Sequence, residues 1–252
     1  MRVGLIGAGN MASALARGWG DPVLCTDAIA ARAAALAAEL GGEVAASNAE
    51  LAQQADVVVL CHKPDQLAAV AEEVAPHAQA VVSILGGVGL EALRGAYPGV
   101  PVIRLMPNVA VEVRQGVICI AAAPDVPAAL ASEVVALLER VATVAHVPEP
   151  LMEVATAVMG VGPAYVSLFV EAQVDAAVRL GMPPELAAQL ATATAAGTAA
   201  LLAARDYDTL GVRRAVTSPG GSTARGLAAL EQGGLRSSFQ AAAEAVVHGG
   251  GR

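Results

Sequence analysis

Three small residues near the start of the chain have the spacing of a phosphate-binding turn. Gly7, Gly9 and Ala12 follow the apolar run VGLI and precede a stretch with helical spacing. Gly7 permits a tight turn, Gly9 lets the backbone approach a pyrophosphate, and Ala12 lets the helix pack closely on the strand. Asn10 and Met11 would stand at the helix amino terminus, which faces the phosphates. The segment predicts a dinucleotide-binding loop, and a glycine-rich turn that only packs is the alternative.

Asp27 follows about 20 residues later, at the end of the second apolar run. An acidic residue in this place binds ribose hydroxyls and disfavours a 2′-phosphate, which favours NAD. Thr26, Arg32 and Asn48 offer further contacts near the ribose, so both NAD and NADP stay open as cofactors. The structural alternative is that Asp27 is the N-cap of a helix that starts near Ile29.

The elements that would hold these residues alternate along the first half of the chain. Short β-branched runs and Ala-rich helical stretches follow one another, a rhythm typical of parallel strands joined by crossover helices. We expect strands at VGLIGA, PVLCTD, Val57–Cys61, Ala80–Leu85, Val100–Leu105, Gly116–Ala121 and near Val144–Val147, and the first helices at Met11–Gly18 and Ile29–Leu40. Strands that are apolar throughout are buried on both faces. The predicted class is α/β, with an amino-terminal Rossmann doubly wound parallel sheet.

Strand-like runs stop near Pro148, and segments rich in Ala, Leu and Val with helical spacing continue to the end. We therefore expect a dinucleotide-binding domain at 1–148 and an all-α domain for substrate binding and dimerisation at 149–252. Long helices are predicted at Pro163–Leu180 and Pro184–Ala204, with shorter helices flanking the loop TSPGGST. About 100 residues of helix with so few polar positions would bury an apolar face against a second copy of the chain. The expected partner is the chain itself, as a homodimer or a ring of dimers.

The composition excludes several classes of protein. The 15 basic and 23 acidic side chains give a formal net charge of −8, which argues against nucleic-acid binding, because phosphate contacts need a basic surface. Hydrophobic residues make up 56% of the chain and charged residues 15%, with a mean hydropathy of +0.58. These values exclude intrinsic disorder and demand a large buried area.

The cysteines, the first residues and one long apolar segment indicate where in the cell the protein works. Cys25, Cys61 and Cys119 are scattered through apolar runs, which predicts free thiols in a reducing compartment. The opening MRVGLIGAGN leaves no room for a charged leader before the first apolar run, so a cytoplasmic location is expected. The uncharged segment Leu186–Ala204 is long enough to raise the question of a membrane, but its Ala and Thr content fits a helix buried between proteins better. No membrane partner is expected.

The loop TSPGGST offers a second anion site. Pro219 fixes a turn, and Gly220 and Gly221 free the backbone to present several N–H groups together. Ser222 and Thr223 stand where the next helix would begin, and its amino terminus would add N–H groups suited to a carboxylate. A helix start capped by Ser or Thr is the structural alternative.

Four segments, taken in order, resemble the pyrroline-5-carboxylate reductase family over nearly the whole chain. They are HKPDQ (His62–Gln66), RLMPN (Arg104–Asn108), GVGPAY (Gly160–Tyr165) and AVTSPGGSTARGLAALEQGGLR (Ala215–Arg236). The resemblance implies reduction of Δ1-pyrroline-5-carboxylate, a cyclic imine, to L-proline by NADH or NADPH, the last step of proline biosynthesis. The iminium form accepts hydride readily, so orientation would carry most of the rate.

The resemblance also implies roles for individual residues. The backbone of Gly220, Gly221, Ser222 and Thr223 would hold the substrate carboxylate. The Thr223 hydroxyl would be the catalytic group, hydrogen-bonded to the ring nitrogen, and Ser218 is a weaker candidate for substrate binding.

Cofactor contacts follow from the resemblance too. Lys63 and Pro64 come after the fourth predicted strand, in the crevice where parallel sheets bind ligands. By resemblance, Lys63 lies near the cofactor ribose and Asn48 near the adenosine. The nicotinamide edge would be lined by the turn Met106, Pro107 and Asn108. A solvated lysine and a purely structural proline turn are the alternatives.

The chain departs from the family pattern at Met159 and Val161, where the family usually has serines, and at Val109–Ala110, where Thr-Pro is common. These changes would make the pocket more apolar. A related or larger cyclic imine therefore stays open as the substrate, and so does a non-catalytic dinucleotide-binding regulatory protein.

Other ionisable residues suggest no catalytic acid and no metal site. The four histidines have no obvious common site: His62, His77, His146 and His248. Glu171 and Asp175 lie about one helical turn apart without a histidine neighbour, which favours a polar helix face over a metal site.

Overall fold

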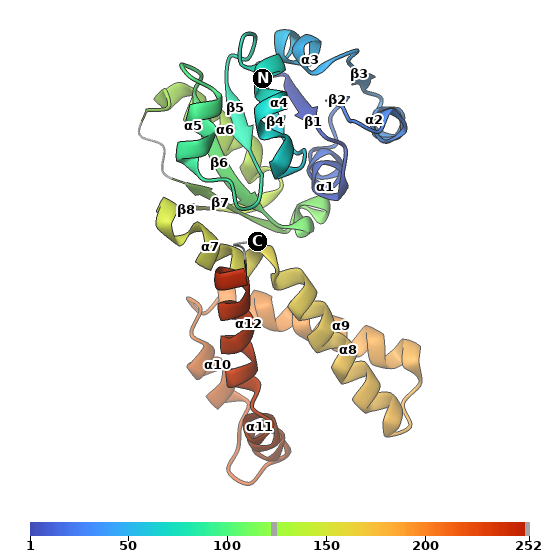
Figure 1. The fold of residues 1–252 in the computed structure, drawn as a ribbon. Coiled ribbons are helices and arrows are strands. Elements are labelled where there is room, and N and C mark those ends of the chain that lie inside the picture. Colours follow the sequence, from blue (N-terminus) through green and yellow to red (C-terminus); the bar gives the residue numbers. More distant parts are fainter. Residues whose placement is uncertain (122–124, 250–252) are drawn as a thin grey trace. The chain divides into compact units, whose positions relative to one another are not determined.

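Eight strands from the amino-terminal half form one sheet in the computed structural model, which describes residues 1–121 and 125–249 (Figure 1). The strands are β1 (Val3–Ile6), β2 (Leu24–Thr26), β3 (Glu43–Val44), β4 (Val57–Leu60), β5 (Val81–Ser83), β6 (Val102–Pro107), β7 (Gly116–Ala121) and β8 (Ala142–Val147). Their order is β3-β2-β1-β4-β5-β6-β7-β8. The order of the first six strands is that of dinucleotide-binding sheets, as expected.

The sheet is mixed rather than wholly parallel, which corrects the expected topology. Parallel pairing extends from β3 through β2, β1, β4 and β5 to β6. β7 then runs antiparallel to β6, with Leu105 opposite Ile120, and β8 is parallel to β7. The connection explains the reversal. The 3₁₀ turn η2 (Val109–Val113) and its flanks are too short for a parallel crossover, which takes roughly a dozen residues or more.

Two strands differ locally from the sequence prediction. β3 was not expected, because its two residues are exposed and form no apolar run. β6 continues to Pro107, so Met106 and Pro107 belong to the strand and not to a turn after it. Backbone pairing of both residues with β7 extends the strand beyond the run that the sequence marks.

Helices cover both faces of the sheet. The helical segments of this half are α1 (Asn10–Trp19), α2 (Ala30–Leu40), α3 (Asn48–Gln54), η1 (Pro64–Gln66), α4 (Leu67–Val74), α5 (Leu90–Ala96), α6 (Ala128–Glu139), η3 (Glu149–Leu151), α7 (Met152–Ala155) and the π-helical turn η4 (Thr156–Gly160). α1, α2 and α6 pack on one face, and α3, α4 and α5 on the other. Neighbouring residues of β4, such as Val57 and Val58, enter opposite cores, which confirms strands buried on both sides.

The described chain divides into two compact units, Met1–Pro163 and Ala164–Gly249. η3, α7 and η4 fall in the first unit, where Met152 and Met159 enter its core. The division thus comes after these turns, whereas the sequence expectation put it before them, at 148. The segment reads as helical in sequence, and only its packing assigns it to the first unit.

The second unit, residues 164–249, is helical throughout and is called the helical unit below. Its elements are α8 (Gly162–Arg179, which starts in the first unit), α9 (Pro184–Ala203), α10 (Thr209–Ala215), α11 (Ser222–Gln232) and α12 (Leu235–Gly249). α8 and α9 agree with the expected ranges to within one residue at each end. Gly181, with φ of +95°, ends the first helix, and Pro184 opens the second.

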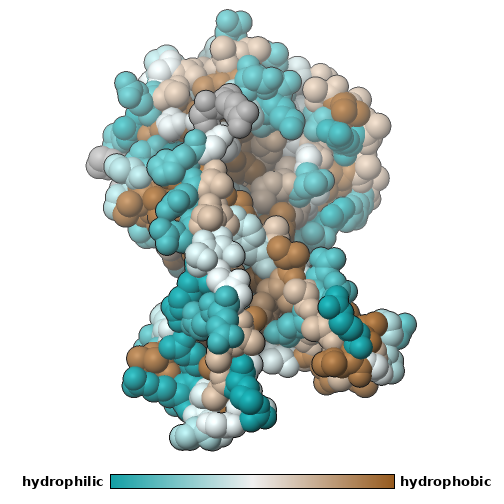
Figure 2. Space-filling model, turned by 60° about the horizontal axis from the view of Figure 1, so that its bottom comes forward, coloured by the Kyte–Doolittle hydropathy of each residue, from teal (hydrophilic) through white to brown (hydrophobic). Residues whose placement is uncertain are grey.

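Apolar side chains of the helical unit are largely exposed in the single chain (Figure 2). Among its described residues only Ala187 and Ala191 are buried, while Leu168 is 63% and Leu190 48% exposed. By length and composition alone, the helices at Glu149–Arg179 and Pro184–Ala203 are apolar enough to cross a membrane. A helix buried in a protein interface has the same composition.

Candidate functional site

The glycine loop between β1 and α1 has close backbone contact on one side and open space on the other. Gly7 has φ of +106°, and its N–H donates to the Thr26 carbonyl at 2.8 Å. A Cβ on Gly7 would come within 2.7 Å of the Cys61 backbone, so only glycine fits there. A Cβ on Gly9 would have no atom within 4 Å. The loop is therefore held firmly at Gly7 and leaves room at Gly9.

The amino terminus of α1 is open beside this space. Gly9 is its N-cap, and no side chain caps the helix. The first-turn N–H groups, at Asn10 and Met11, therefore lack a side-chain partner and suit an anion. Ala12 is 1% exposed and lets α1 sit close to the sheet, as predicted. Uncapped amides next to an open glycine fit a pyrophosphate.

A cleft of about 770 Å³ adjoins the loop within the first unit. This volume lies in the range of small-molecule and cofactor sites. Its walls include the glycine loop, the turn after β2, the start of α3, the turn after β4 and one side of α4. Five residues expected to bind the cofactor line it: Gly7, Gly9, Asp27, Asn48 and Lys63.

Asp27 lies in the cleft wall with both carboxylate oxygens engaged by the backbone. Its Oδ1 accepts from the Ile29 N–H and its Oδ2 from the Ala8 N–H, each at 2.7 Å. Ile29 is the N-cap of α2 and no side chain caps the helix, so Asp27 does not take the capping role of the structural alternative. Its contact with the Ile29 N–H belongs to the turn at the start of α2. The contact with the Ala8 N–H ties that start to the glycine loop. The carboxylate therefore has a structural task in addition to any contact with a ribose.

Asn48 belongs to a short polar chain along the same cleft. The Thr26 hydroxyl donates to Asn48 Oδ1 at 2.7 Å, and Asn48 Nδ2 donates to Glu73 Oε2 at 2.9 Å. These contacts fix the amide at the amino terminus of α3 and join it to α4. The sequence analysis did not identify Glu73 as a site residue, because a single glutamate in a helical segment matches no binding motif.

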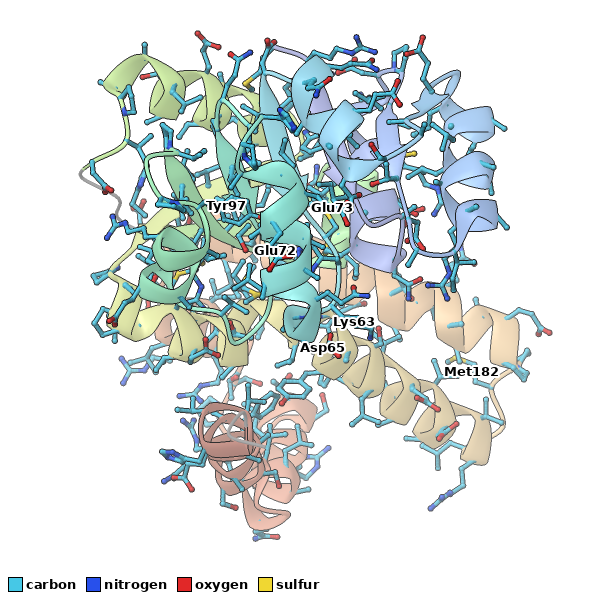
Figure 3. The ribbon with its side chains drawn as sticks, turned by 45° about the horizontal axis from the view of Figure 1, so that its top comes forward. Lys63, Asp65, Glu72, Glu73, Tyr97 and Met182 are labelled. Atoms are coloured by element: carbon cyan, nitrogen blue, oxygen red, sulfur yellow. The ribbon has the colours of Figure 1, made fainter. Side chains whose placement is uncertain are left out.

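Lys63, the only lysine in the sequence, lies at the start of η1, before α4 with Glu72 and Glu73 (Figure 3). Its backbone N–H donates to Gln66 Oε1 at 3.2 Å, which sets the turn. The side chain is exposed and forms no ion pair in the described part of the chain. Pro64 is exposed next to it, outside the cleft lining. A free ammonium at the cleft is available to an anionic ligand.

His62 lines the cleft beside Lys63. Its Nδ1 lies 2.8 Å from the Lys63 carbonyl, a contact that assigns the proton to Nδ1. Its Nε2 is buried without a partner among the described residues. Burial lowers the pKa of His62 below its ordinary value and favours the neutral ring. A neutral histidine is a poor proton donor, and His77 and His146 are exposed on the surface of this unit.

Met106, Pro107 and Asn108 are buried at the carboxyl end of β6. The Asn108 side chain uses both ends of its amide: Nδ2 donates to the Met159 carbonyl at 3.1 Å, and Oδ1 accepts from the Val117 N–H at 3.2 Å. It therefore joins β7 to η4. Any contact of this segment with a nicotinamide would come from its backbone or from the remaining edge of Met106, which is 8% exposed.

Arg104 forms a buried ionic cluster that sequence reasoning missed. Its side chain is 3% exposed, and its two terminal nitrogens contact Glu149 Oε1 at 2.7 Å and Glu153 Oε1 at 2.8 Å. Glu149 Oε1 also accepts from the Leu90 N–H at 2.9 Å, at the start of α5. The RLMPN motif contained the arginine, but its partners lie more than 40 residues away in sequence. The cluster fastens η3 and α7 to the sheet.

Two of the departures from the family pattern, Met159 and Val161, lie in different surroundings. Met159 is 9% exposed and packs in the core of the first unit, so its side chain fills space between the sheet and η4. Val161 is half-buried after η4. The loss of a hydroxyl at Met159 thus changes packing, and Met159 no longer supports a larger substrate.

The loop Thr217–Thr223 of the helical unit connects α10 to α11. Gly220 has φ of +69°, and Arg225 Nη1 donates to the Gly220 carbonyl at 2.7 Å. The N-cap of α11 is Gly221, with no side-chain cap, so neither Ser222 nor Thr223 takes the capping role of the structural alternative. The first amides of an eleven-residue helix are therefore free of side-chain partners.

Side chains of this loop are open to a ligand. Ser218 and Ser222 are exposed and Thr223 is half-buried. The Thr223 hydroxyl makes no hydrogen bond with the described residues. Tyr165 of the GVGPAY motif packs edge-on against Phe239 within the same unit, with ring centroids 6.2 Å apart.

The remaining candidates are two acidic residues on α8 and the three cysteines, and the structure gives them no catalytic surroundings. Glu171 and Asp175 are exposed on α8, and no group of three potential metal ligands occurs in the described ranges. All three cysteines are free thiols, as expected. Burial raises the pKa of Cys25, Cys61 and Cys119, which keeps them protonated and unreactive.

Two family models match the chain in separate segments. Residues 2–87 match the model described as NADP oxidoreductase coenzyme F420-dependent, and residues 149–250 match pyrroline-5-carboxylate reductase dimerisation. The first segment contains the glycine loop and most of the cleft. The second begins at η3 and contains the whole helical unit.

Relatives and solved structures named pyrroline-5-carboxylate reductase or pyrroline carboxylate reductase are similar to nearly the whole chain. The pyrroline-5-carboxylate reductase of Synechocystis is 36% identical over 255 residues, covering 98% of this chain and 96% of the relative. The Streptococcus pyogenes 1-pyrroline-5-carboxylate reductase structure aligns with a TM-score of 0.91 at 28% identity, covering 99% of this chain and 98% of that one. The Plasmodium falciparum pyrroline carboxylate reductase with NADP bound aligns with a TM-score of 0.87 at 26% identity, covering 99% and 97%.

Proposed function

This chain belongs to the pyrroline-5-carboxylate reductase family, and we propose that it reduces Δ1-pyrroline-5-carboxylate to L-proline with NADPH. Curated relatives and solved structures of that name support the proposal over nearly the whole length of the chain. The single observation that carries it within the site is the start of α11. There the most specific motif of the family forms an uncapped helix terminus beside a free threonine hydroxyl.

The cofactor residues would act through binding and orientation. The open position at Gly9 and the free amides of α1 would take the pyrophosphate. Asn48, held by Thr26 and Glu73, would face the adenosine end, and Lys63 would supply a cation near a ribose or phosphate. Bound NADPH supplies a hydride from its nicotinamide ring. Met106, Pro107 and Asn108 would border that ring, with Asn108 acting mainly through the backbone that it holds.

The substrate residues would hold an anion and a ring nitrogen. Backbone N–H groups from Gly220 to Thr223 would bind the carboxylate, because a helix amino terminus with a left-handed glycine presents them together. The Thr223 hydroxyl would hydrogen-bond the ring nitrogen, and Ser218 would border the carboxylate. Hydride adds to the C=N carbon, and the electron pair of the π bond moves onto nitrogen.

The protein does not need to supply a proton to the substrate nitrogen. The iminium form of the substrate already carries the proton on nitrogen, so its reduction needs no acid from a side chain. This agrees with a cleft in which burial lowers the pKa of His62. Positioning then accounts for most of the rate.

The reaction is tested by the loss of nicotinamide absorbance when the purified protein is mixed with Δ1-pyrroline-5-carboxylate and NADPH. We expect rapid oxidation and proline as the product, identified by mass. The six-membered cyclic imine acid, run alongside, should be reduced more slowly. Faster reduction of the six-membered substrate would replace the proposed substrate, and bound NADPH without oxidation by either imine would overturn the proposed reaction.

The helical unit would complete the protein through a second copy of the chain. Its match to a dimerisation family and its exposed apolar helices support a homo-oligomer. We propose that the chain assembles as a homodimer. Light scattering would detect a ring of dimers by its larger mass. Free, unreactive thiols agree with a cytoplasmic location.

A further inference from the structure

The imidazole of His62 has one ring nitrogen that the described residues leave without a partner. Nδ1 lies 2.8 Å from the Lys63 carbonyl oxygen, which can only accept, so Nδ1 carries the proton of the neutral ring. Nε2 is buried and has no hydrogen-bond partner in the described part of the chain. Burial lowers the pKa of His62, while the Lys63 carbonyl and the charge of Asp65 oppose that shift. Burial thus favours the neutral ring in the free protein.

The position of His62 is next to the glycine loop. Its side chain lines the 770 Å³ cleft together with Gly7 and Gly9. The two backbones also lie close together, because a Cβ on Gly7 would come 3.0 Å from the His62 backbone nitrogen. The open position at Gly9 and the free amides of α1, where we propose that the pyrophosphate binds, belong to the same loop. A dinucleotide in the cleft would therefore bring negative charge close to His62.

The other charged groups around His62 belong to several elements. Four of them line the cleft: Asp27 after β2, Arg32 on α2, Lys63 at the start of η1 and Glu73 on α4. Asp65 lies on η1 beside Lys63, outside the lining (Figure 3). The Cys61 thiol also lines the cleft, and burial raises its pKa. Histidine is the side-chain type whose ordinary pKa lies near neutrality, so among the lining residues His62 is the one that a ligand could protonate there.

We propose that His62 takes up a proton at Nε2 when the dinucleotide binds, and that the resulting imidazolium binds the pyrophosphate. An Nε2–H without an acceptor is unfavourable in the free protein, and a phosphate oxygen supplies that acceptor. The proton comes from solvent and serves the cofactor, since the substrate iminium already carries its own. Binding then raises the pKa of His62, so by linkage the cofactor binds more tightly as the pH falls. The inference deepens the proposed function and rests on it for the identity of the cofactor.

The direct test is calorimetric titration of the full chain with NADPH in buffers of different ionisation enthalpy, which counts the protons bound with the cofactor. The 2′-phosphate of NADPH titrates near neutrality itself, but it contributes equally to the wild type and to His62→Gln. We expect the wild type to take up as much as about one proton more than His62→Gln. The Kd ratio of variant to wild type should fall about 5-fold between about pH 6 and pH 8.

Two controls locate the proton. His77→Gln, which removes an exposed histidine outside the cleft, should keep the wild-type proton uptake. NADH has the pyrophosphate but no 2′-phosphate, and it should give the same difference between wild type and His62→Gln as NADPH does. A difference with NADPH that is absent with NADH would assign the proton to the 2′-phosphate contact and overturn the proposal.

The remaining outcomes separate this inference from its alternative and from the proposed reaction. Equal proton uptake by the wild type and His62→Gln would overturn the proposal. If the variant then binds NADPH more weakly by the same factor at every pH, His62 acts as a neutral hydrogen-bond partner of the cofactor. A protein that takes up the proton through His62 but fails to reduce Δ1-pyrroline-5-carboxylate would refute the reaction and keep the role of His62. Reduction without this proton uptake would keep the reaction and refute the role.

Discussion

At the scale of single residues, identical side chains have opposite surroundings. Gly7 and Gly9 are two residues apart, yet a Cβ would collide with the Cys61 backbone at the first and meet no protein atom at the second. Gly7 is needed for the fold, with its φ of +106°, whereas the open space at Gly9 is where we propose that the pyrophosphate binds. Thr223 likewise differs from the helix-capping threonine that its position in sequence suggests, because Gly221 is the N-cap.

The first residue-scale prediction concerns the glycine loop. Gly9→Val should fold normally and lose NADPH binding by on the order of 100-fold, because the new side chain fills the space proposed for the pyrophosphate. Fluorescence titration with NADPH and circular dichroism check the two halves of this expectation. The matched variant Gly7→Ala should instead be poorly folded. Normal NADPH binding by Gly9→Val would remove the loop from the cofactor site.

The second residue-scale prediction concerns the substrate hydroxyl. Thr223→Ala should lower kcat about 10-fold, the value of one hydrogen bond to a charged group, and leave the Kd for NADPH unchanged. Thr223→Ser keeps a hydroxyl in place and should recover most of the rate. Steady-state kinetics with Δ1-pyrroline-5-carboxylate provide the measurement. If Thr223→Ala turns over at the wild-type rate, the hydroxyl has no part in catalysis.

At the scale of elements, the segment from η3 to η4 decides where the first unit ends. Arg104 of β6 holds Glu149 and Glu153, and Asn108 holds the Met159 carbonyl, so strand and turns are joined at two places. The same turns open the dimerisation family match at 149. The family model thus groups this segment with the helical unit, whereas its contacts attach it to the sheet of the first unit.

The element-scale prediction tests this attachment. Arg104→Met should lower the free energy of unfolding by about 3 kcal/mol, because it leaves partly buried carboxylates without their cation. Arg94→Met breaks an exposed pair with Asp125 and should cost less than about 1 kcal/mol. Urea unfolding of both variants gives the comparison. Similar losses in the two variants would show that burial of Arg104 adds nothing.

At the scale of the whole molecule, the helical unit is incomplete as a single chain. Only two of its described residues are buried, and leucines, valines and phenylalanines are exposed along its helices (Figure 2). Apolar surface of this extent is typical of a protein interface. Its match to a dimerisation family identifies the partner as a second copy.

The prediction at this scale is that Leu168→Glu, on α8, weakens the oligomer. The side chain is 63% exposed in the single chain, and a carboxylate there would be buried without a partner in the proposed homodimer. Size-exclusion chromatography with light scattering should show a dimer or larger for the wild type and a smaller species for the variant. Glu171→Gln, an exposed change on the same helix, should keep the wild-type mass. A monomeric wild-type protein would contradict the proposed assembly.

Local sequence patterns predicted part of the fold and part of the candidate site. Spacing and residue type placed the glycine loop, seven of the eight strands, both long helices and the loop Thr217–Thr223, because each depends on neighbours within a few residues. Long-range contacts decided the rest. The antiparallel turn into β7, the Arg104 cluster, the burial of Met159 and the engagement of Asp27 all join residues that are distant in sequence or depend on how the chain packs. Such contacts leave no local pattern, since a buried ion pair or a core methionine is specified by the surface that it meets after folding.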